Sequence, residues 1–281
     1  MRALSAPLFK KKPADALLAI LTWLCAAFTF FVLAYLIIYI VAKGVAYIKP
    51  SLFAPTYNTE NVSLLPALAT TVLMVAASLV IAVPIGVSAA IYLVEYAKRG
   101  NRLVKLVRMT TETLSGIPSI VYGLFGWLFF VTALGWGYSM LAGCFTLSIM
   151  ILPLIIRSTE EGLKAVSDSY REGSYGLGAG RLRTVLVIVL PAAAPGILAG
   201  VILAVGRIVG ETAALIYTAG TVPQIPKNPL ASGRTLAIHL YALSSEGLYT
   251  GQAYATAVVL LVTVVGINAL SALLAKKLAK I

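Results

Sequence analysis

Residues 172–191 read EGSYGLGAGRLRTVLVIVLP, and this stretch decides how we expect the chain to be arranged. Its first half is rich in glycine and its second half is apolar, so it does not suit one uniform helix. The residues before it, from Arg157 onward, carry mixed charges, whereas a long apolar run follows. We therefore expect short helices outside a membrane, broken near Gly176, Gly178 and Gly180, that lead into a spanning helix.

The composition indicates an integral membrane protein, because 60% of the 281 residues are hydrophobic and only 11% are charged. A soluble domain of this length needs more polar residues to cover its surface. The short alternating segments of a membrane β-barrel are absent, so helices are the expected spanning structure. A bilayer core about 30 Å thick needs about 20 apolar residues of helix. The candidate runs are 16–42, 66–94, 114–135, 139–156, 184–218 and 253–275, which predicts six spans.

The basic residues predict the orientation of these spans. If the spans alternate from a cytoplasmic N-terminus, most of the 22 lysines and arginines fall on the cytoplasmic side. Both termini are therefore expected in the cytoplasm. The net charge of +12 is explained by this bias and by contact with anionic membrane lipid, so we expect no nucleic-acid partner.

Two regions are expected along the chain. Residues 1–65 are expected to hold an N-terminal cytoplasmic tail, an anchor helix and an external loop. Residues 66–281 are expected to form one transmembrane domain, with a cytoplasmic coupling loop at 157–183. The sequence contains no GxxxxGK[ST] phosphate loop, so any ATP hydrolysis is expected in a separate chain. We expect no catalytic residue, metal site or cofactor in this one.

Arg207 and Glu211 lie inside the fifth apolar run, four residues apart, so on a helix they share one face and could pair. A charge within a membrane is costly and marks a candidate functional residue. Arg207 offers a planar donor fork that matches a tetrahedral oxyanion. Glu211 would offset this charge in an empty path and accept a hydrogen bond from a protonated anion, and Thr212 would add a hydroxyl. The alternative is a structural ion pair, because the Gly206-xxx-Gly210 spacing suits close helix contact.

Two further features lie at the ends of predicted spans. Arg157, at the cytoplasmic end of the fourth run, is a second candidate anion contact. The alternative is an interfacial arginine whose side chain reaches toward water. Pro118 and Pro153 are expected to mark kinks, where irregular backbone can line a cavity.

The opening stretch resembles the EAA signature of permease subunits in ABC importers. The matching elements are Glu172-Gly173-Ser174, three residues, Gly178, nine residues, Ile188, one residue and Leu190-Pro191. A short surface helix of this kind can dock into a groove on a separate ATPase, and Gly178 permits a sharp turn. Gly173 and Ser174 stand where the family usually has two alanines, and the glycine is expected to weaken the helix by up to about 1 kcal/mol.

Further stretches resemble phosphate-importer permeases of the PstA type. They are GIPSIVYGLFG (116–126), LPLIIRSTEEGL (152–163), GRIVGETAALIYTAG (206–220) and LYTGQAYATAVVLLVTVVGIN (248–268). The resemblance implies a type I ABC importer fold in the cytoplasmic (inner) membrane, where it is multi-pass, and import of inorganic phosphate by alternating access. It also implies a second related permease, an ATPase dimer that binds ATP and Mg²⁺, and an external phosphate-binding protein. Arg207 and Glu211 match polar positions that the family associates with the translocation path.

Two other functions are consistent with the same residues. One is an importer for another oxyanion, such as sulfate or molybdate. The other is a stand-alone secondary transporter, in which Arg207 and Glu211 would form an ion-coupled site and the 157–183 loop would be only a tether.

Overall fold

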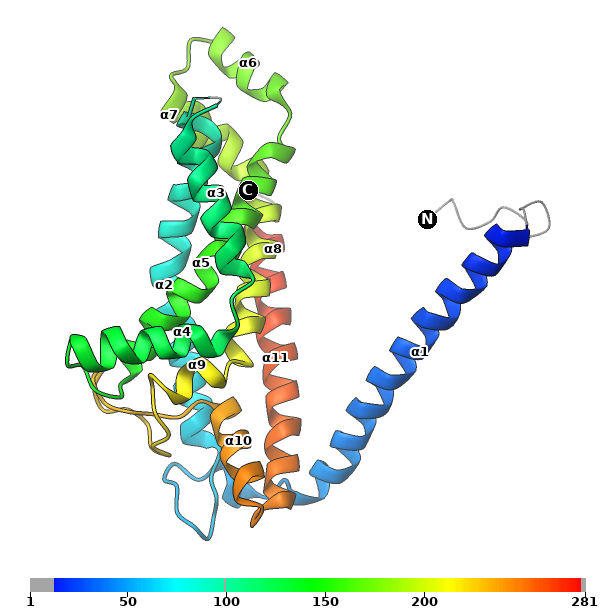
Figure 1. Ribbon diagram of the computed structural model, residues 1–281, viewed down its shortest axis with the longest axis vertical. Helices are drawn as coiled ribbons and strands as arrows, with labels where there is room; N and C mark the ends of the chain where they lie inside the picture. Colours follow the sequence, from blue (N-terminus) through cyan, green and yellow to red (C-terminus); the bar gives the residue numbers. More distant parts are fainter. Residues whose placement is uncertain (1–12, 99, 279–281) are drawn as a thin grey trace.

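The computed structural model describes residues 13–98 and 100–278, and within these ranges every regular element is helical. The helices form an elongated bundle, with α6 at one end and α10 at the other (Figure 1). The expected N-terminal tail falls largely on residues 1–12, which lie outside the described residues, as do Arg99 and residues 279–281.

Several α-helices are extended by π-helical turns, in which the backbone hydrogen bond spans five residues instead of four. In chain order the elements are α1 (Pro13–Gly44), η2 (Val45–Tyr47), η3 (Pro50–Phe53), α2 (Leu65–Ile91), η4 (Tyr92–Tyr96), α3 (Arg102–Ser115), α4 (Ser119–Gly126), η5 (Trp127–Ala133), α5 (Met140–Ala165), α6 (Asp168–Gly176), α7 (Arg181–Thr184), η6 (Val185–Val189), α8 (Leu190–Val209), α9 (Ala213–Ile216), α10 (Leu236–Glu246) and α11 (Thr250–Leu278). Of the η elements, η2 and η3 are 3-10 turns and η4, η5 and η6 are π turns.

The predicted class of multi-pass helical membrane protein is confirmed. Five helical segments are long and apolar enough to cross a bilayer, and a sixth span exists when α3 and α4 are counted together. The five are Ala14–Tyr47, Leu65–Tyr96, Met140–Ala165, Arg181–Val209 and Thr250–Leu273. They correspond to the first, second, fourth, fifth and sixth predicted runs. The orientation of the bundle across a membrane stays a prediction.

The third predicted span, 114–135, is not one continuous helix and is broken near Pro118. Its residues belong to α3 and to α4 with η5, which are bent by 104° relative to each other. Figure 1 shows α4 running across the bundle while α3 runs along it. Pro118 begins α4 and stops α3 from continuing, which confirms the expected break, whereas Pro153 lies inside the continuous helix α5. The Tyr122 hydroxyl donates a 2.8 Å hydrogen bond to the Leu114 carbonyl oxygen, so the exposed end of α3 is capped from α4.

Two predicted boundaries also need correction. The fifth run, 184–218, ends as a helix at Val209, and after a turn at residues 210–212 the chain forms the short helix α9. Apolar residues continue beyond the turn, so the extent of the run concealed the break. The fourth run, 139–156, extends as α5 to Ala165, because a helix that leaves the membrane can continue with polar residues.

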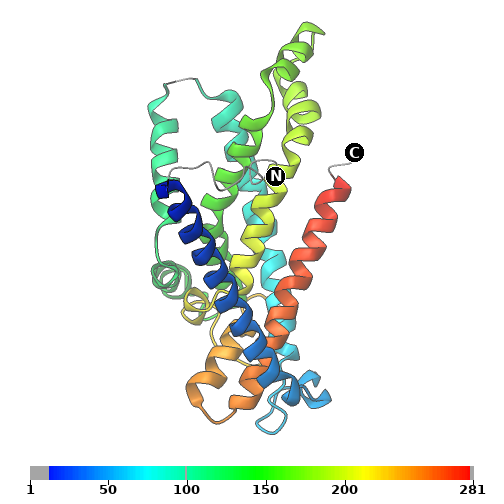
Figure 2. The ribbon, with the colours of Figure 1, turned by 90° about the vertical axis from the view of Figure 1, so that its right-hand side faces the viewer.

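The centre of the bundle is formed by α2, α5 and α8, whose buried apolar side chains make one cluster that includes Met74, Leu147, Ile151 and Ile208. α11 lies along the flank of α8 (Figure 2). α1 meets the rest of the chain at one end, where Gly44 packs against the Tyr254 carbonyl group. Elsewhere α1 diverges from the bundle, and its large apolar side chains are exposed (Figure 1).

α5 and α8 approach each other closely through small residues. A Cβ atom built on Gly196 of α8 would lie 2.8 Å from the Cα atom of Gly162 on α5, and one built on Gly200 would overlap Ser158. Each helix therefore contributes two small residues four positions apart, an arrangement that allows close helix contact in membranes. Because Gly196 faces Gly162 while Gly200, farther along α8, faces the earlier residue Ser158, α5 and α8 are antiparallel.

The Gly206-xxx-Gly210 spacing does not mark a contact of this kind within the chain. The nearest neighbour of a Cβ atom built on Gly206 would be the Asn268 amide nitrogen at 4.0 Å, and Gly210 would meet only the Gly206 carbonyl oxygen at 3.8 Å. The alternative in which these glycines fix helix packing therefore finds no support in contacts within the described part of the chain.

We expect Gly196→Ala to destabilise the bundle, because the new methyl group must push α8 away from the α5 backbone. Overpacking of this kind costs roughly 1–3 kcal/mol. Gly266→Ala on α11 is the matched control, because nothing lies within 4 Å of its built Cβ atom. Thermal unfolding in detergent should show a lower midpoint for Gly196→Ala only. An unchanged midpoint for Gly196→Ala would contradict the close contact.

Candidate functional site

The predicted short helices at the α6 end of the bundle are confirmed. α6 ends at Gly176, and α7 begins at Arg181. Between them Gly178 has a φ of +83°, which is the left-handed region that glycine occupies without strain. The Gly178 amide donates to the Tyr175 carbonyl oxygen at 2.9 Å and the Ala179 amide to the Ser174 carbonyl oxygen at 3.1 Å, so the turn closes the end of α6.

α6 has one face toward the bundle and one face away from it. Ser174 is buried, and its hydroxyl shares a 2.8 Å hydrogen bond with the Thr184 hydroxyl on α7. Glu172 and Gly173 are exposed, as are Tyr170 and Leu177. The exposed surface of α6 and of the residue that follows it therefore includes a carboxylate, an aromatic and an apolar side chain. The sequence does not predict this hydrogen bond between two hydroxyl groups, because Ser174 occupies a position of the signature where the family usually has alanine.

The second half of the signature builds the entry into α8. Ile188 lies in the π turn η6, and it lines a hollow together with Ser167 and Tyr170 beside α6. Leu190 and Pro191 form the first turn of α8, where the missing amide hydrogen of proline is not needed. These three residues therefore connect the α6 segment to a spanning helix.

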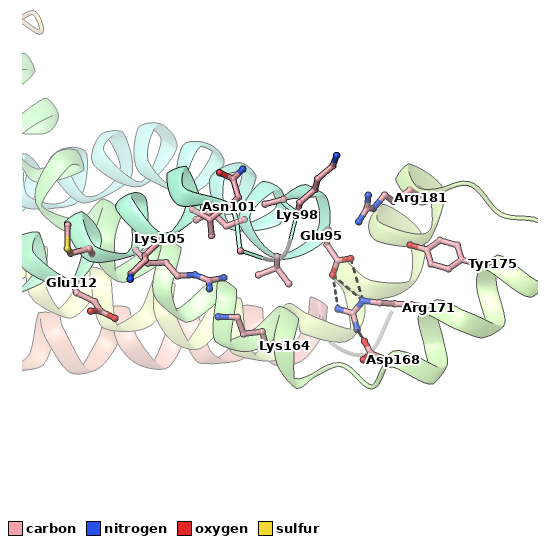
Figure 3. A pocket seen from close by; sticks show the side chains of 17 residues that line it. Glu95, Lys98, Asn101, Lys105, Glu112, Lys164, Asp168, Arg171, Tyr175 and Arg181 are labelled. Carbon is pink, nitrogen blue, oxygen red and sulfur yellow. Dashed lines mark hydrogen bonds and ion pairs between the residues drawn. The ribbon is translucent and has the colours of Figure 1, made fainter.

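A cavity of about 960 Å³ lies beside this segment, between the end of α2, α3 and α6 (Figure 3). Two buried carboxylates near it are held by basic residues. Arg171 Nη2 donates to Glu95 Oε1 at 2.7 Å. Glu160 Oε2 accepts from Lys164 Nζ at 2.7 Å and forms an ion pair with Arg108 Nε at 3.1 Å. The hydrogen bond to Glu95 raises the pKa of the Arg171 guanidinium, so Arg171 remains protonated.

The sequence interpretation missed Glu95. Its neighbours read YLVEYAKRG, which resembles the ordinary polar end of an apolar run. A signal was present, because a carboxylate that close to a spanning segment is costly unless it is paired. The identity of the partner, 76 positions away in the chain, required the fold.

Arg207 lies in the last turn of α8, half-buried, where the helix dipole favours a positive charge. It makes no ion pair within the described part of the chain. Glu211 is buried beyond the end of α8, and its Oε1 accepts a 3.1 Å hydrogen bond from the Ala214 amide at the start of α9. The expected pairing along one helix face is therefore wrong, because the helix ends at Val209 before it reaches Glu211.

The chain directly after the turn between α8 and α9 packs against α4. A Cβ atom built on Gly123 of α4 would lie 2.8 Å from the Ala214 Cα atom, so the two backbones are in direct contact. Figure 1 shows α4 and α9 next to each other. Thr212 is partly buried in this turn, and its hydroxyl points toward the Gly210 carbonyl oxygen at 3.5 Å. Arg207, Glu211 and Thr212 thus lie at one interruption of a spanning helix, where irregular backbone can line a path.

Arg157 does not join this group. Its side chain is 65% exposed, and Nε donates to Glu161 Oε1 at 3.0 Å. Ser158 of α5 faces Gly200 of α8, and Arg207 is seven residues farther along α8, which is roughly 10 Å at 1.5 Å per residue. Arg157 is therefore paired with Glu161 at an exposed position, and it lies at a different level of the bundle from Arg207.

A second polar group is buried near the α10 end. Arg234 is 6% exposed, and its guanidinium lies 4.6 Å from the centre of the Tyr57 ring. The same ring meets His239 edge-on at 6.1 Å. Burial, together with the charge of Arg234, lowers the pKa of His239 to about 3. His239 is therefore neutral at neutral pH, in agreement with a structural histidine.

We expect Gly178→Ala to destabilise the turn between α6 and α7 by about 1 kcal/mol, because an L side chain is strained in the left-handed region. No atom lies within 4 Å of the built Cβ atom, so the strain is conformational and not steric. Gly173→Ala, in open space at a helical φ, is the matched control and should stabilise α6 slightly. Limited proteolysis between α6 and α7 should be faster for Gly178→Ala only. Equal rates for the two variants would contradict the role of the turn.

Comparison with known proteins agrees with this architecture. Residues 82–280 match the family described as binding-protein-dependent transport system inner membrane component. The chain is 33% identical over 254 residues to the probable ABC transporter permease protein YqgI of Bacillus subtilis (strain 168), over 85% of this chain and 86% of that protein. It is 32% identical over 267 residues to the phosphate transport system permease protein PstA of Haemophilus influenzae, over 92% of each protein.

The fold has counterparts among solved structures. It matches a chain in the crystal structure of a bacterial alginate ABC transporter in complex with an alginate pentasaccharide-bound periplasmic protein, with a TM-score of 0.68 over 95% of this chain and 96% of that one. The sequence identity is 14%, so this likeness concerns the fold alone. The spanning helices, the glycine-broken segment at α6 and the match over residues 82–280 agree on one family. The chain belongs to the binding-protein-dependent transport system inner membrane components, and its fold is that of ABC importer permeases.

Proposed function

We propose that the chain is the permease subunit of an ATP-driven importer that moves inorganic phosphate across the cytoplasmic membrane by alternating access. Likeness to a phosphate transport permease over 92% of both proteins supports this substrate. The observation that carries the coupling to ATP is α6, a short helix at one end of the bundle, where Tyr170 and Glu172 of α6 and Leu177 directly after it are exposed. A helix of this kind suits a groove on another protein.

ATP hydrolysis is assigned to a separate ATPase dimer, which binds ATP and Mg²⁺. This chain has no GxxxxGK[ST] motif with which to hold the nucleotide phosphates. On docking, Leu177 would bury apolar surface, and Glu172 would offer a carboxylate to a basic residue of the ATPase. Rigid-body movement of the ATPase would then reach α8 through Ile188, Leu190 and Pro191.

Arg207 is the proposed anion contact in the translocation path. Support comes from its half-buried position, the absence of an ion pair to it in the described part of the chain, and the neighbouring helix interruption. A planar guanidinium can donate two hydrogen bonds to one tetrahedral oxyanion. Glu211 would accept a hydrogen bond from a protonated phosphate, and Thr212 would add a hydroxyl. Arg157 is proposed as a separate contact on the cytoplasmic side.

The complete importer would contain further proteins. We assign a second related permease as the partner within the membrane and an external phosphate-binding protein at the α10 end. Both termini would be cytoplasmic, which puts α6 on the same side as the ATPase. In this arrangement residues 1–65 supply an anchor helix and an external loop, and residues 66–281 supply the transmembrane domain with its 157–183 coupling loop.

Transport by reconstituted vesicles tests the proposal directly. The assembled importer is placed in vesicles with ATP inside and with the binding protein and labelled phosphate outside. We expect ATP-dependent uptake that excess sulfate or molybdate does not suppress. Uptake that persists without ATP would favour a secondary transporter, and suppression by sulfate or molybdate would favour a different oxyanion. Either result would overturn the proposal.

Variants of the path residues sharpen this test. Arg207→Ala should reduce uptake roughly 10- to 100-fold, the effect of losing about 1.5–3 kcal/mol of charged hydrogen bonding. Arg157→Ala should have a smaller effect, because Glu161 already neutralises Arg157 at an exposed site. Glu211→Gln keeps an oxygen for the Ala214 amide, so the turn should persist while discrimination against sulfate relaxes. Unchanged selectivity in Glu211→Gln would contradict the assigned role of that carboxylate.

A further inference from the structure

The Arg171 side chain is almost fully enclosed and uses all of its donor groups. Its Nη2 donates to Glu95 Oε1 at 2.7 Å and to the Leu163 carbonyl oxygen at 2.9 Å. Nη1 donates to the Val166 carbonyl oxygen at 2.8 Å and to Asp168 Oδ1 at 3.2 Å, while Nε faces both Glu95 oxygens. The side chains of Arg171 and Glu95 are 13% and 5% exposed. Figure 3 shows the guanidinium between Glu95 and Asp168.

These contacts join α6 to two spanning helices at once. Glu95 belongs to η4, the π turn that ends α2. Leu163 and Val166 provide carbonyl groups at the end of α5, where the last carbonyl groups of a helix lack the regular α-helical hydrogen bonds. Arg171 therefore caps α5 and binds the end of α2 through one rigid, planar group.

One turn farther along, α6 has a second attachment. Ser174 shares its hydrogen bond with Thr184, which directly precedes the π turn η6 at the start of α8. Beside it, the Arg181 guanidinium of α7 lies 5.1 Å from the centre of the Tyr96 ring in η4. In the described part of the chain, the Arg171 contacts and the Arg181–Tyr96 contact are the side-chain polar links from the α6–α7 segment to η4 and the end of α5, whereas Ser174–Thr184 joins α6 to α7.

Both attachments of α6 therefore lie at π turns. In η4 the Ala97 amide donates to the Tyr92 carbonyl oxygen at 2.9 Å, five residues back, and in η6 the Leu190 amide donates in the same way to Val185. Single π turns inside α-helices often accompany functional sites, because they locally change the direction of the helix. A pull on α6 would act on α2 and α8 at these two turns.

We propose that the Glu95–Arg171 pair is the joint through which a displacement of α6 reaches α2, so that both are positioning residues for the transport cycle. The inference rests on the proposed function, in which an ATPase displaces α6. The pair is suited to this because a guanidinium fork fixes orientation as well as distance, which a lysine ammonium does not. Arg171 points into the bundle while the adjacent Glu172 is exposed, so joint and docking residue are separate.

Coupling measurements in the reconstituted importer test this joint. Phosphate uptake and ATP hydrolysis are measured together for the wild type, Arg171→Lys, Glu95→Gln and the matched control Glu112→Gln, whose side chain is exposed on the same cavity. We expect both joint variants to bind the ATPase and hydrolyse ATP. Phosphate imported per ATP should fall about tenfold, as expected when a charge-assisted hydrogen-bonded pair is weakened. Glu112→Gln should match the wild type.

A purely structural role would give a different pattern. Assembled joint variants with a wild-type ratio of phosphate to ATP would overturn the inference. So would failure of both joint variants to assemble with the ATPase, because the pair would then be required for folding or docking. Phosphate uptake and ATP hydrolysis by the wild-type complex test the proposed function separately. If the ratio of phosphate imported to ATP hydrolysed is normal in the wild type and in both joint variants, the joint is rejected while the proposed function stands.

Discussion

Every backbone amide and carbonyl group in a lipid-facing segment needs a hydrogen-bond partner within the protein, and this requirement organises the whole chain. Regular helices meet it along the spans. Where a helix stops, a side chain from another element takes over. Tyr122 caps α3 from α4, Glu211 caps α9, and Arg171 caps α5 from α6. These helix ends are therefore held by specific contacts, and two of them, at the α8–α9 turn and at α6, are places to which we assign function.

This constraint also explains how a short polar helix can control long apolar ones. α6 is held by a buried ion pair and, one turn farther along, by a buried hydroxyl pair, and both attachments lie at π turns of spanning helices. A buried ion pair adds little net stability, but breaking it leaves an uncompensated charge. Such a pair is suited to fixing one geometry, which is what transmission of movement requires. Docking itself depends on exposed residues such as Leu177.

The helical class, five of the six predicted spans and the glycine-broken segment followed from the sequence, because apolar run length and glycine position act locally. The bend at Pro118 was visible as a proline, but its 104° angle depends on how α4 packs against α9. The pairing of Arg207 with Glu211 was wrong, since apolar residues on both sides hid the end of α8 at Val209. Glu95 was missed because its partner is remote in sequence. Contacts between distant segments depend on the tertiary fold, which residue spacing alone does not determine.

The central claim is that the exposed surface of α6 and of the residue that follows it receives the ATPase. It can be measured by cross-linking in the assembled importer, with Cys25 and Cys144 replaced by serine and a single cysteine introduced in place of Leu177. Leu248→Cys, which is 79% exposed near the α10 end, is the control, against 91% for Leu177. A short thiol-to-amine reagent should link position 177 to the ATPase, with a yield that changes when ATP binds, and should leave position 248 unlinked. No link from position 177, or equal links from both positions, would contradict the account.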